Sequence, residues 1–248
     1  VQPYGFYWFL LAEEVAVPSW HSDAPEPQPE FVTLVVPKGL KSLLDGKGRG
    51  ELEDGILKSF MPYQRWFAAK NADIAGIKIE FGELVGEGQD EHLLLGVTAD
   101  LGGGDRQTYL LPLDAAWGEE NIGHGNPLLP YTVAEVRKGP RLGALCDATH
   151  GAGFARSTLK AMLADRTVEG EGGTLRYRHS PTFTLESDLD TVAIQRVGVE
   201  QSNTSIMIGQ EVIMKAYRQL AEGVHPEIEV GRFLTDVAGF QNTPPLVG

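Results

Sequence analysis

The sequence predicts an α+β protein in which most strands are antiparallel. Strand-like apolar runs follow one another along the chain, at 74–84, 92–99 and 107–112. Gly102–Gly104 forms a hairpin connection between the last two of these runs. Three further short strands between 192 and 217 are joined by a polar loop and a tight turn. Helical spacing of apolar residues occurs in separate stretches, which completes the α+β pattern.

The composition bounds the class of protein. The 248 residues are 42% hydrophobic and 22% charged, as in an ordinary globular chain. A net charge of −13 argues against a nucleic-acid partner or an anionic membrane. Cys146 is the only cysteine, so we expect no intrachain disulfide and a reducing, cytoplasmic compartment. The six histidines have no metal-site spacing, and no metal-ligating residues are predicted.

The first thirty residues differ from the rest. Residues 1–16 are expected to form one strand, either the last strand of a preceding β domain or an edge strand of the present one. Residues 17–30 are rich in proline and polar residues, which predicts an extended linker. The chain has no initiator methionine and stops without a natural ending, so we expect it to be a piece of a longer protein.

A new unit is expected from Phe31. It begins with a strand at 31–36, and a glycine-rich turn at 46–50 precedes a helix at 51–61. The following segment, 63–70, concentrates aromatic and basic residues. Two interpretations stay open there. Trp66 and Phe67 anchor the helix to a sheet, or Arg65 or Lys70 contacts a ligand or a catalytic lobe.

The middle of the chain adds several shorter elements. The patterns predict a strand at 131–137, helical segments at 144–147 and 156–165, a turn at 170–173 and a strand at 174–178.

The last predicted strand, 211–217, carries one lysine among apolar neighbours. Strand alternation places Ile213, Lys215 and Tyr217 on one face, and the opposite face carries Val212, Met214 and Ala216. A helix with two early glutamates follows at 225–237. A strand lysine followed by a helix glutamate is the arrangement with which a kinase small lobe holds the phosphates of ATP. The alternative is a lysine that is simply solvated.

The chemistry of this pattern suits a triphosphate. The lysine ammonium supplies a compact positive charge, and a neighbouring glutamate orients it. The polar loop before the second short strand would cover the phosphates with amides and hydroxyls, from Ser202, Asn203, Thr204 and Ser205. The glycine-rich signature of a generic kinase loop is missing there.

Several motifs in order resemble maltokinases, from Phe31 to Gly248. They are Gln64-Arg-Trp-Phe67 with Lys70, Val199-Glu-Gln-Ser-Asn-Thr-Ser205, Val212-Ile-Met-Lys215, and Arg232-Phe-Leu234 in a Pro-Glu-Ile-Glu helix. The resemblance implies phosphorylation of maltose at its reducing end with ATP and Mg²⁺, which gives maltose 1-phosphate for glucan and trehalose metabolism. It implies a cap subdomain at 31–125, with a curved antiparallel sheet and helices. An intermediate subdomain resembling a protein-kinase small lobe would follow at 126–248.

The same resemblance suggests residue roles. Lys215 takes the place of the nucleotide lysine, with Glu229 as the first choice for its helix partner and Glu227 as the alternate. Ser202, Asn203, Thr204 and Ser205 take the place of the phosphate loop. The family's large lobe, with its catalytic Asp and magnesium ligands, would lie beyond Gly248, so no catalytic residue is assigned and the chain alone is expected to be inactive.

Residues 3–10 are similar to the closing strand of trehalose synthases, which are fused to maltokinases in many bacteria. The expected partners are therefore ATP, maltose and a preceding trehalose synthase domain. Two other readings remain open. One is a non-catalytic cap or tether, with Trp20, Trp66 and Trp117 stacking on sugars. The other is a relative with another acceptor, such as an aminoglycoside or homoserine kinase.

Overall fold

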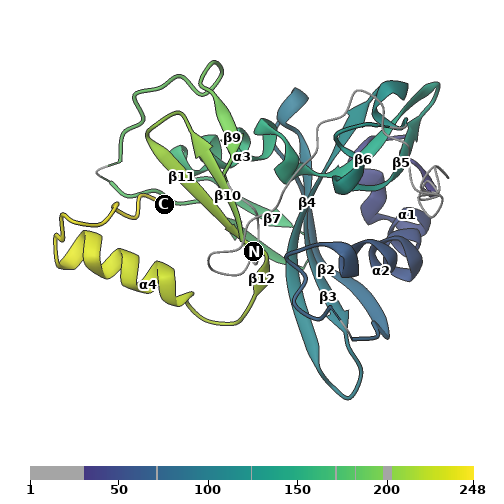
Figure 1. Ribbon diagram of the computed structural model, residues 1–248, viewed down its shortest axis with the longest axis horizontal. Coiled ribbons are helices and arrows are strands. Elements are labelled where there is room, and N and C mark those ends of the chain that lie inside the picture. The colour runs from purple at the N-terminus through teal and green to yellow at the C-terminus, as the bar shows by residue number, and fades with distance from the viewer. Residues whose placement is uncertain (1–30, 71, 124, 171, 182, 198–202) are drawn as a thin grey trace, which may run out of the picture. The chain divides into compact units, whose positions relative to one another are not determined.

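The computed structural model describes residues 31–248 apart from 71, 124, 171, 182 and 198–202 (Figure 1). The chain divides into two compact units, 1–30 and 31–248. The strand expected at 1–16 and the linker expected at 17–30 lie outside the described residues. No helix in the described part of the chain is long and apolar enough to cross a membrane.

A main sheet forms the centre of the described unit. Its strands are ordered β1-β5-β6-β4-β3-β2, and β12 pairs with β4 beside this path. The pairs are antiparallel except β1 with β5. The strand bounds are β1 Thr33–Val35, β2 Gly76–Val85, β3 His92–Asp100, β4 Arg106–Trp117, β5 Thr132–Lys138, β6 Arg141–Asp147 and β12 Gln219–Leu220. The predicted α+β class with a curled, mostly antiparallel sheet is confirmed.

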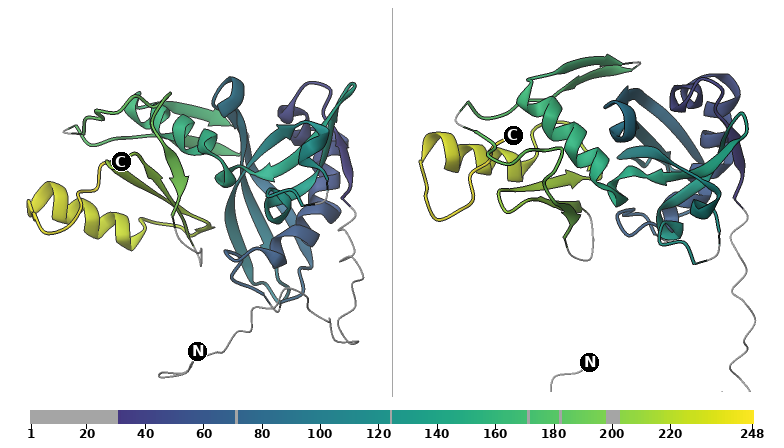
Figure 2. Two further views of the ribbon diagram at one scale, coloured as in Figure 1. Left: turned by 45° about the horizontal axis from the view of Figure 1, so that its top comes forward. Right: turned by 90° about the horizontal axis from the view of Figure 1, so that it is seen from above.

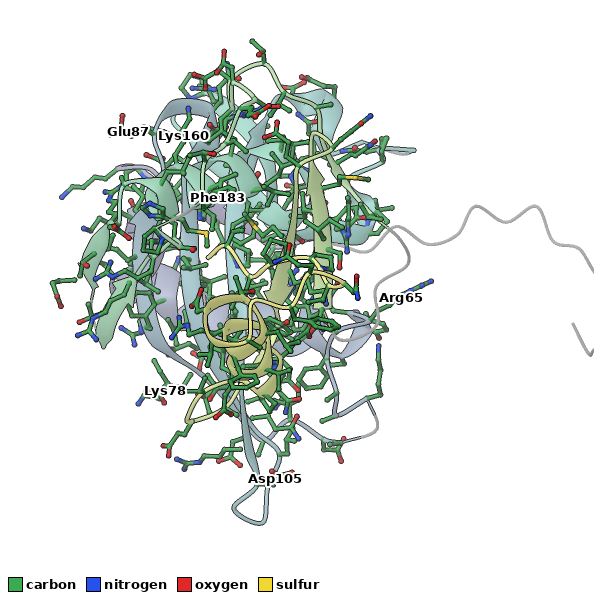
Figure 3. The ribbon with its side chains drawn as sticks, turned by 90° about the vertical axis from the view of Figure 1, so that its left-hand side faces the viewer. Arg65, Lys78, Glu87, Asp105, Lys160 and Phe183 are labelled. Carbon is green, nitrogen blue, oxygen red and sulfur yellow. The ribbon has the colours of Figure 1, made fainter. Side chains whose placement is uncertain are left out.

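The hairpin predicted at Gly102–Gly104 joins β3 to β4. Asp100 pairs with Arg106 at its base, and all three glycines have positive φ values, which glycine adopts without strain. Figure 3 shows Asp105 near the tip of this hairpin.

Helical segments cover one face of the main sheet. A continuous helical run consists of α1 Gly46–Glu51, a π turn Leu52–Ile56, α2 Leu57–Phe60 and a 3-10 turn Met61–Tyr63. Apolar residues of this run pack against Leu93, Leu95 and Val97, on one side of β3. Figure 1 shows α2 beside β2, in agreement with their contacts.

The turn expected at 46–50 is wrong, because the helix already begins at Gly46. Tertiary contacts outweigh the low helix propensity of its glycines. The Arg49 guanidinium donates to the Ile79 carbonyl and to Glu53, and the Glu53 carboxylate accepts from the Ile79 amide at 2.8 Å. These bonds fix the first turn of the helix on β2.

Trp66 and Phe67 anchor the end of this helical run. Both side chains are buried, and their rings lie 5.6 Å and 5.1 Å from the ring of Tyr109 on β4. The anchoring interpretation is thus confirmed. Lys70 donates to the carbonyl of Gln64, and Arg65 is exposed at the periphery of the molecule (Figure 3).

The other face of the main sheet packs on α3 Ala152–Leu163 and on a second sheet. This small sheet has the order β11-β10-β9, with bounds β9 Ile194–Arg196, β10 Asn203–Ile208 and β11 Val212–Tyr217. Leu94 of β3 joins a second apolar cluster with Leu159 of α3 and with Ile206 and Ile208 of β10. In both views of Figure 2, α3 lies beside the small sheet. The main sheet is therefore covered on both faces.

The remaining elements complete the described unit. A separate hairpin joins β7 Thr167–Gly170 to β8 Gly173–Arg176, around the predicted turn. The C-terminal helical run is α4 Pro226–Arg232 with a π turn Phe233–Val237. Further 3-10 turns lie at Leu40–Leu44, Gly88–Asp90, Glu119–Asn121, Leu129–Tyr131 and Ala148–His150.

One expectation for the middle of the chain is wrong. The helical segment expected at 144–147 is part of strand β6, which pairs with both β4 and β5. A short, fully buried apolar run does not distinguish helix from strand by periodicity. The main sheet runs past residue 125 and takes in β5, β6 and β12.

Candidate nucleotide site

Lys215 lies on the open face of the small sheet. Val212 and Ala216 are buried, whereas Ile213 and Lys215 are exposed, so the predicted alternation is confirmed. In the register of β10 with β11, Ser205 lies opposite Lys215. Directly opposed residues of an antiparallel pair share a face. We define the open face as Asn203, Ser205, Met207, Ile213, Lys215 and Tyr217.

A carboxylate from α4 meets the lysine on this face. Lys215 Nζ donates to Glu227 Oε1, and the Tyr217 phenol hydrogen-bonds the same carboxylate. His225 lies at the N-cap of α4, accepts from the Glu227 amide at 3.3 Å, and its ring lies 4.0 Å from the ring of Tyr217. The first turn of α4 is therefore held against the end of β11.

The helix partner of Lys215 is Glu227, the alternate of the sequence prediction, and not Glu229. Residues two apart on a helix do not share a face. With Glu227 directed at Lys215, Glu229 points elsewhere and is exposed. Phe233 lies one helical turn after Glu229 and is 56% exposed, and α4 has no buried residue, so no inward face of α4 carries Glu229.

The contacts shift two ionisation equilibria. The Lys215 ammonium and the Tyr217 phenol lower the pKa of the Glu227 carboxyl, because both donate hydrogen bonds to its charged form. Partial burial, followed by the hydrogen bond to Glu227, raises the pKa of Tyr217. Near neutral pH the site therefore combines an anionic glutamate and a neutral phenol beside the lysine.

The predicted phosphate loop is only partly where the sequence put it. Ser202 lies outside the described residues. Asn203, Thr204 and Ser205 belong to strand β10 instead of a loop, so their side chains alternate between faces. Asn203 and Ser205 share the open face with Lys215. Thr204 points inward, is fully buried, and accepts a hydrogen bond from Arg218 at 3.2 Å, which removes it from the candidate phosphate ligands.

Arg218 is the residue that the sequence interpretation missed. It is fully buried between β11 and β12 and forms an ion pair with the buried Asp147 at the end of β6. It also donates to Thr149 Oγ1 at 3.0 Å and to the Leu110 carbonyl at 3.3 Å. Extending the alternation of β11 by one residue would have placed Arg218 inward with Ala216. The strand predicted from the sequence ends at Tyr217, one residue before Arg218.

The surroundings of Trp66 and Trp117 argue against the alternative in which these rings stack on sugars. Trp66 is 3% exposed and belongs to the core. Trp117 is half-buried, with the Arg141 guanidinium 4.9 Å from the centre of its ring. Trp20 lies outside the described residues. Neither of the two described tryptophans therefore presents an uncovered ring to a sugar.

Across residues 31–248 without the gaps given above, no three His, Cys, Asp or Glu side chains come together as a group that could hold a metal ion.

A family model, the maltokinase N-terminal cap domain, matches residues 60–150. The match begins at Phe60, the last residue of α2, runs through β2 to β6, and ends at His150. It indicates a protein of a kinase family. Within that class, it indicates a maltokinase-related protein, and it supports the maltokinase cap that the sequence resembles. The match includes β5 and β6, in agreement with the extent of the main sheet.

Proposed function

We propose that residues 31–248 are the nucleotide-holding part of a sugar kinase that transfers phosphate from ATP to the reducing end of maltose. The product would be maltose 1-phosphate, a donor for glucan and trehalose metabolism. The observation that carries this proposal is the pairing of Lys215 with Glu227 on an exposed sheet face, in a chain whose residues 60–150 match a maltokinase cap.

The open face is apolar at one end and polar in the middle, an arrangement that suits a nucleotide. At one end, Met207 lies opposite Ile213, which is 61% exposed, and this pair offers an apolar surface to a base. In the middle, Ser205 lies opposite Lys215 and offers a hydroxyl beside an ammonium to a phosphate. A strand rises about 3.3 Å per residue, so the two pairs are about 7 Å apart along the strand. That spacing suits a base and the phosphates of one nucleotide.

The chemical step needs groups beyond this face. Phosphoryl transfer uses acidic side chains to hold magnesium and to accept the proton of the attacking hydroxyl. The described residues offer no cluster of side chains that fits magnesium. The proposal assigns those groups to a large lobe outside residues 31–248. It also includes a trehalose synthase in the same polypeptide, as the similarity of residues 3–10 suggests.

Nucleotide titration of matched lysine variants tests the proposal. Lys215→Ala should weaken ATP binding about 10- to 100-fold in calorimetry, since a hydrogen bond to a charged group contributes about 1.5–3 kcal/mol. Lys78→Ala is the control, because Lys78 is also an exposed strand lysine, paired with Glu80 at 3.0 Å. It should leave ATP affinity unchanged. Equal affinities of wild type and Lys215→Ala would overturn the assignment of Lys215.

A non-catalytic interaction module is the second candidate. The exposed apolar side chains of the C-terminal helical run favour it, namely Val230, Phe233, Val237 and the nearby Phe240. Such a module would bind no ATP, so the same titration separates the two functions. Failure of the wild-type chain to bind ATP at millimolar concentration would favour the module.

A further inference from the structure

We infer that Arg218 is a positioning residue. Through it the main sheet fixes the position of Lys215 and hence the affinity for nucleotide. This inference rests on the proposed function for its consequence, but its structural part stands on contacts of the described residues. Arg218 touches neither the open face nor any group that would meet the nucleotide.

The guanidinium of Arg218 joins two sheets. On the side of the main sheet it bonds Asp147, Thr149 and the carbonyl of Leu110. On the side of the small sheet it donates to Thr204 of β10. Its carbon lies 5.1 Å from the ring centre of Trp66, within the range of a cation–π contact. The Arg218 side chain thus connects the main sheet to β10 and β11, the two strands that carry Ser205 and Lys215.

No loop separates β11 from β12. Arg218 is the single residue between β11 and β12, and its carbonyl accepts from the Leu110 amide at 2.7 Å. Gln219 then pairs with Tyr109 of β4. Lys215 is three residues before Arg218, so a fixed length of strand separates the lysine from the cap.

Strand register explains how the contacts of Arg218 affect the position of Lys215. A slip of one residue in an antiparallel pair moves every side chain to the opposite face. Such a slip in β11 would turn Lys215 toward the apolar cluster and separate it from Glu227. It would also pull Arg218 out of its bonds with Asp147 and Thr149. The buried ion pair therefore holds Lys215 on the open face.

The planar, branched shape of the Arg218 guanidinium is required for this role. Three of its nitrogens donate to acceptors in different directions, with Nε on Thr204, Nη1 on Leu110 and Nη2 on Asp147 and Thr149. A lysine ammonium is a compact point charge and cannot reach all of these acceptors. Arg218→Lys therefore keeps the charge and removes the connection between the two sheets.

The test compares Arg218→Lys and Thr204→Val with Arg156→Met. Arg156 pairs with Asp90 at 2.7 Å and donates to the carbonyl of Leu189, so its variant also removes a partly buried ion pair, whose partners lie outside β10 and β11. The readouts are ATP affinity by calorimetry and the pKa of the Glu227 carboxyl by NMR. Thr204→Val keeps shape and removes one bond, which preserves a folded variant if Arg218→Lys does not fold.

The expected result has two parts. Arg218→Lys should weaken ATP binding about tenfold and return the pKa of Glu227 toward the ordinary glutamate value, with smaller changes of the same sign in Thr204→Val. Arg156→Met should change neither. An unchanged Glu227 pKa in folded Arg218→Lys or Thr204→Val would overturn the inference. If the wild type binds no ATP, the proposed function fails, and the Glu227 titration still decides whether Arg218 positions Lys215.

Discussion

Two cations three residues apart on the same stretch of chain have opposite surroundings. The side chains of Lys215 and Glu227 are 47% and 48% exposed, whereas those of Arg218 and Asp147 are 0% and 2% exposed. Strand alternation separates them, since Lys215 points to the open face and Arg218 to the interior. Both are ion pairs between a basic and an acidic side chain, but the first is half exposed to water and the second lies in the core.

This difference separates a contact that a ligand can reach from one that is part of the interior. Both members of the exposed pair are accessible to solvent, so a phosphate can approach Lys215 while Glu227 still orients it. Removing one member of a buried pair leaves a charge without water or counterion. Lys215 is thus suited to binding, and Arg218 to holding the sheets together.

The largest expected effect comes from breaking the buried pair. Arg218→Met should lower the free energy of unfolding by about 3–5 kcal/mol, because Asp147 stays buried without its counterion. Urea unfolding followed by tryptophan fluorescence measures this loss. Adding Asp147→Leu to Arg218→Met should recover much of it, since the uncompensated charge is removed. A loss below about 1 kcal/mol in the single variant would show that Asp147 finds another partner or water.

A smaller loss is expected when the arginine keeps its charge partner and loses one acceptor. Thr204→Val should cost about 1–3 kcal/mol, because the buried Nε of Arg218 is left without its hydroxyl partner. Ser205→Ala is the matched control on the next residue of the same strand. It lies on the open face and should change stability by about 0.5 kcal/mol or less. Equal effects of the two variants would contradict the assignment of opposite faces.

Breaking the exposed pair should hardly change stability. Lys215→Ala should alter the free energy of unfolding by about 0–1 kcal/mol, because the pair is half exposed and screened by solvent. The same urea unfolding measures it. The comparison between the two pairs fails if Lys215→Ala destabilises the protein as much as Arg218→Met.

The smallest effect is a pH dependence of the exposed pair. The pKa of Glu227 is lowered in the folded state, so the contribution of its carboxylate is present above the unfolded pKa and is lost as pH falls through the folded pKa. The contact with Lys215 should therefore persist at a pH where an unperturbed glutamate is already protonated. Carboxyl NMR of Glu227 measures the midpoint. In Lys215→Ala the midpoint should move upward, and an unchanged midpoint would show that Lys215 does not stabilise the anion.

Local patterns predicted many elements because their causes lie in adjacent residues. The alternation of Val212–Tyr217 placed Lys215 on one face with Ile213 and Tyr217, and the glycines at 102–104 marked a hairpin. The aromatic pair Trp66 and Phe67 indicated an anchor, which the contacts with Tyr109 confirm. The resemblance of the cap to maltokinases also came from the sequence, and the family match at 60–150 supports it.

Other features depended on residues far apart in the chain. The helix at Gly46 forms because Arg49 and Glu53 bond Ile79, which no local propensity reveals. The apolar run at 144–147 is a strand because β4 and β5 offer it edges on both sides. The choice of Glu227 over Glu229 follows from the tertiary contacts of the first turn of α4, where the His225 ring lies against Tyr217 and Glu227 accepts from Lys215.

The sequence by itself determined which face of β11 carries Lys215, because side chains of a strand alternate whatever the strand packs against. Only the tertiary structure decided what holds that face in place. Arg218 has its acceptors at residues 110, 147, 149 and 204, and these come together only when the two sheets pack. A buried charge requires all of its partners at once, so its role becomes visible only after the chain has folded.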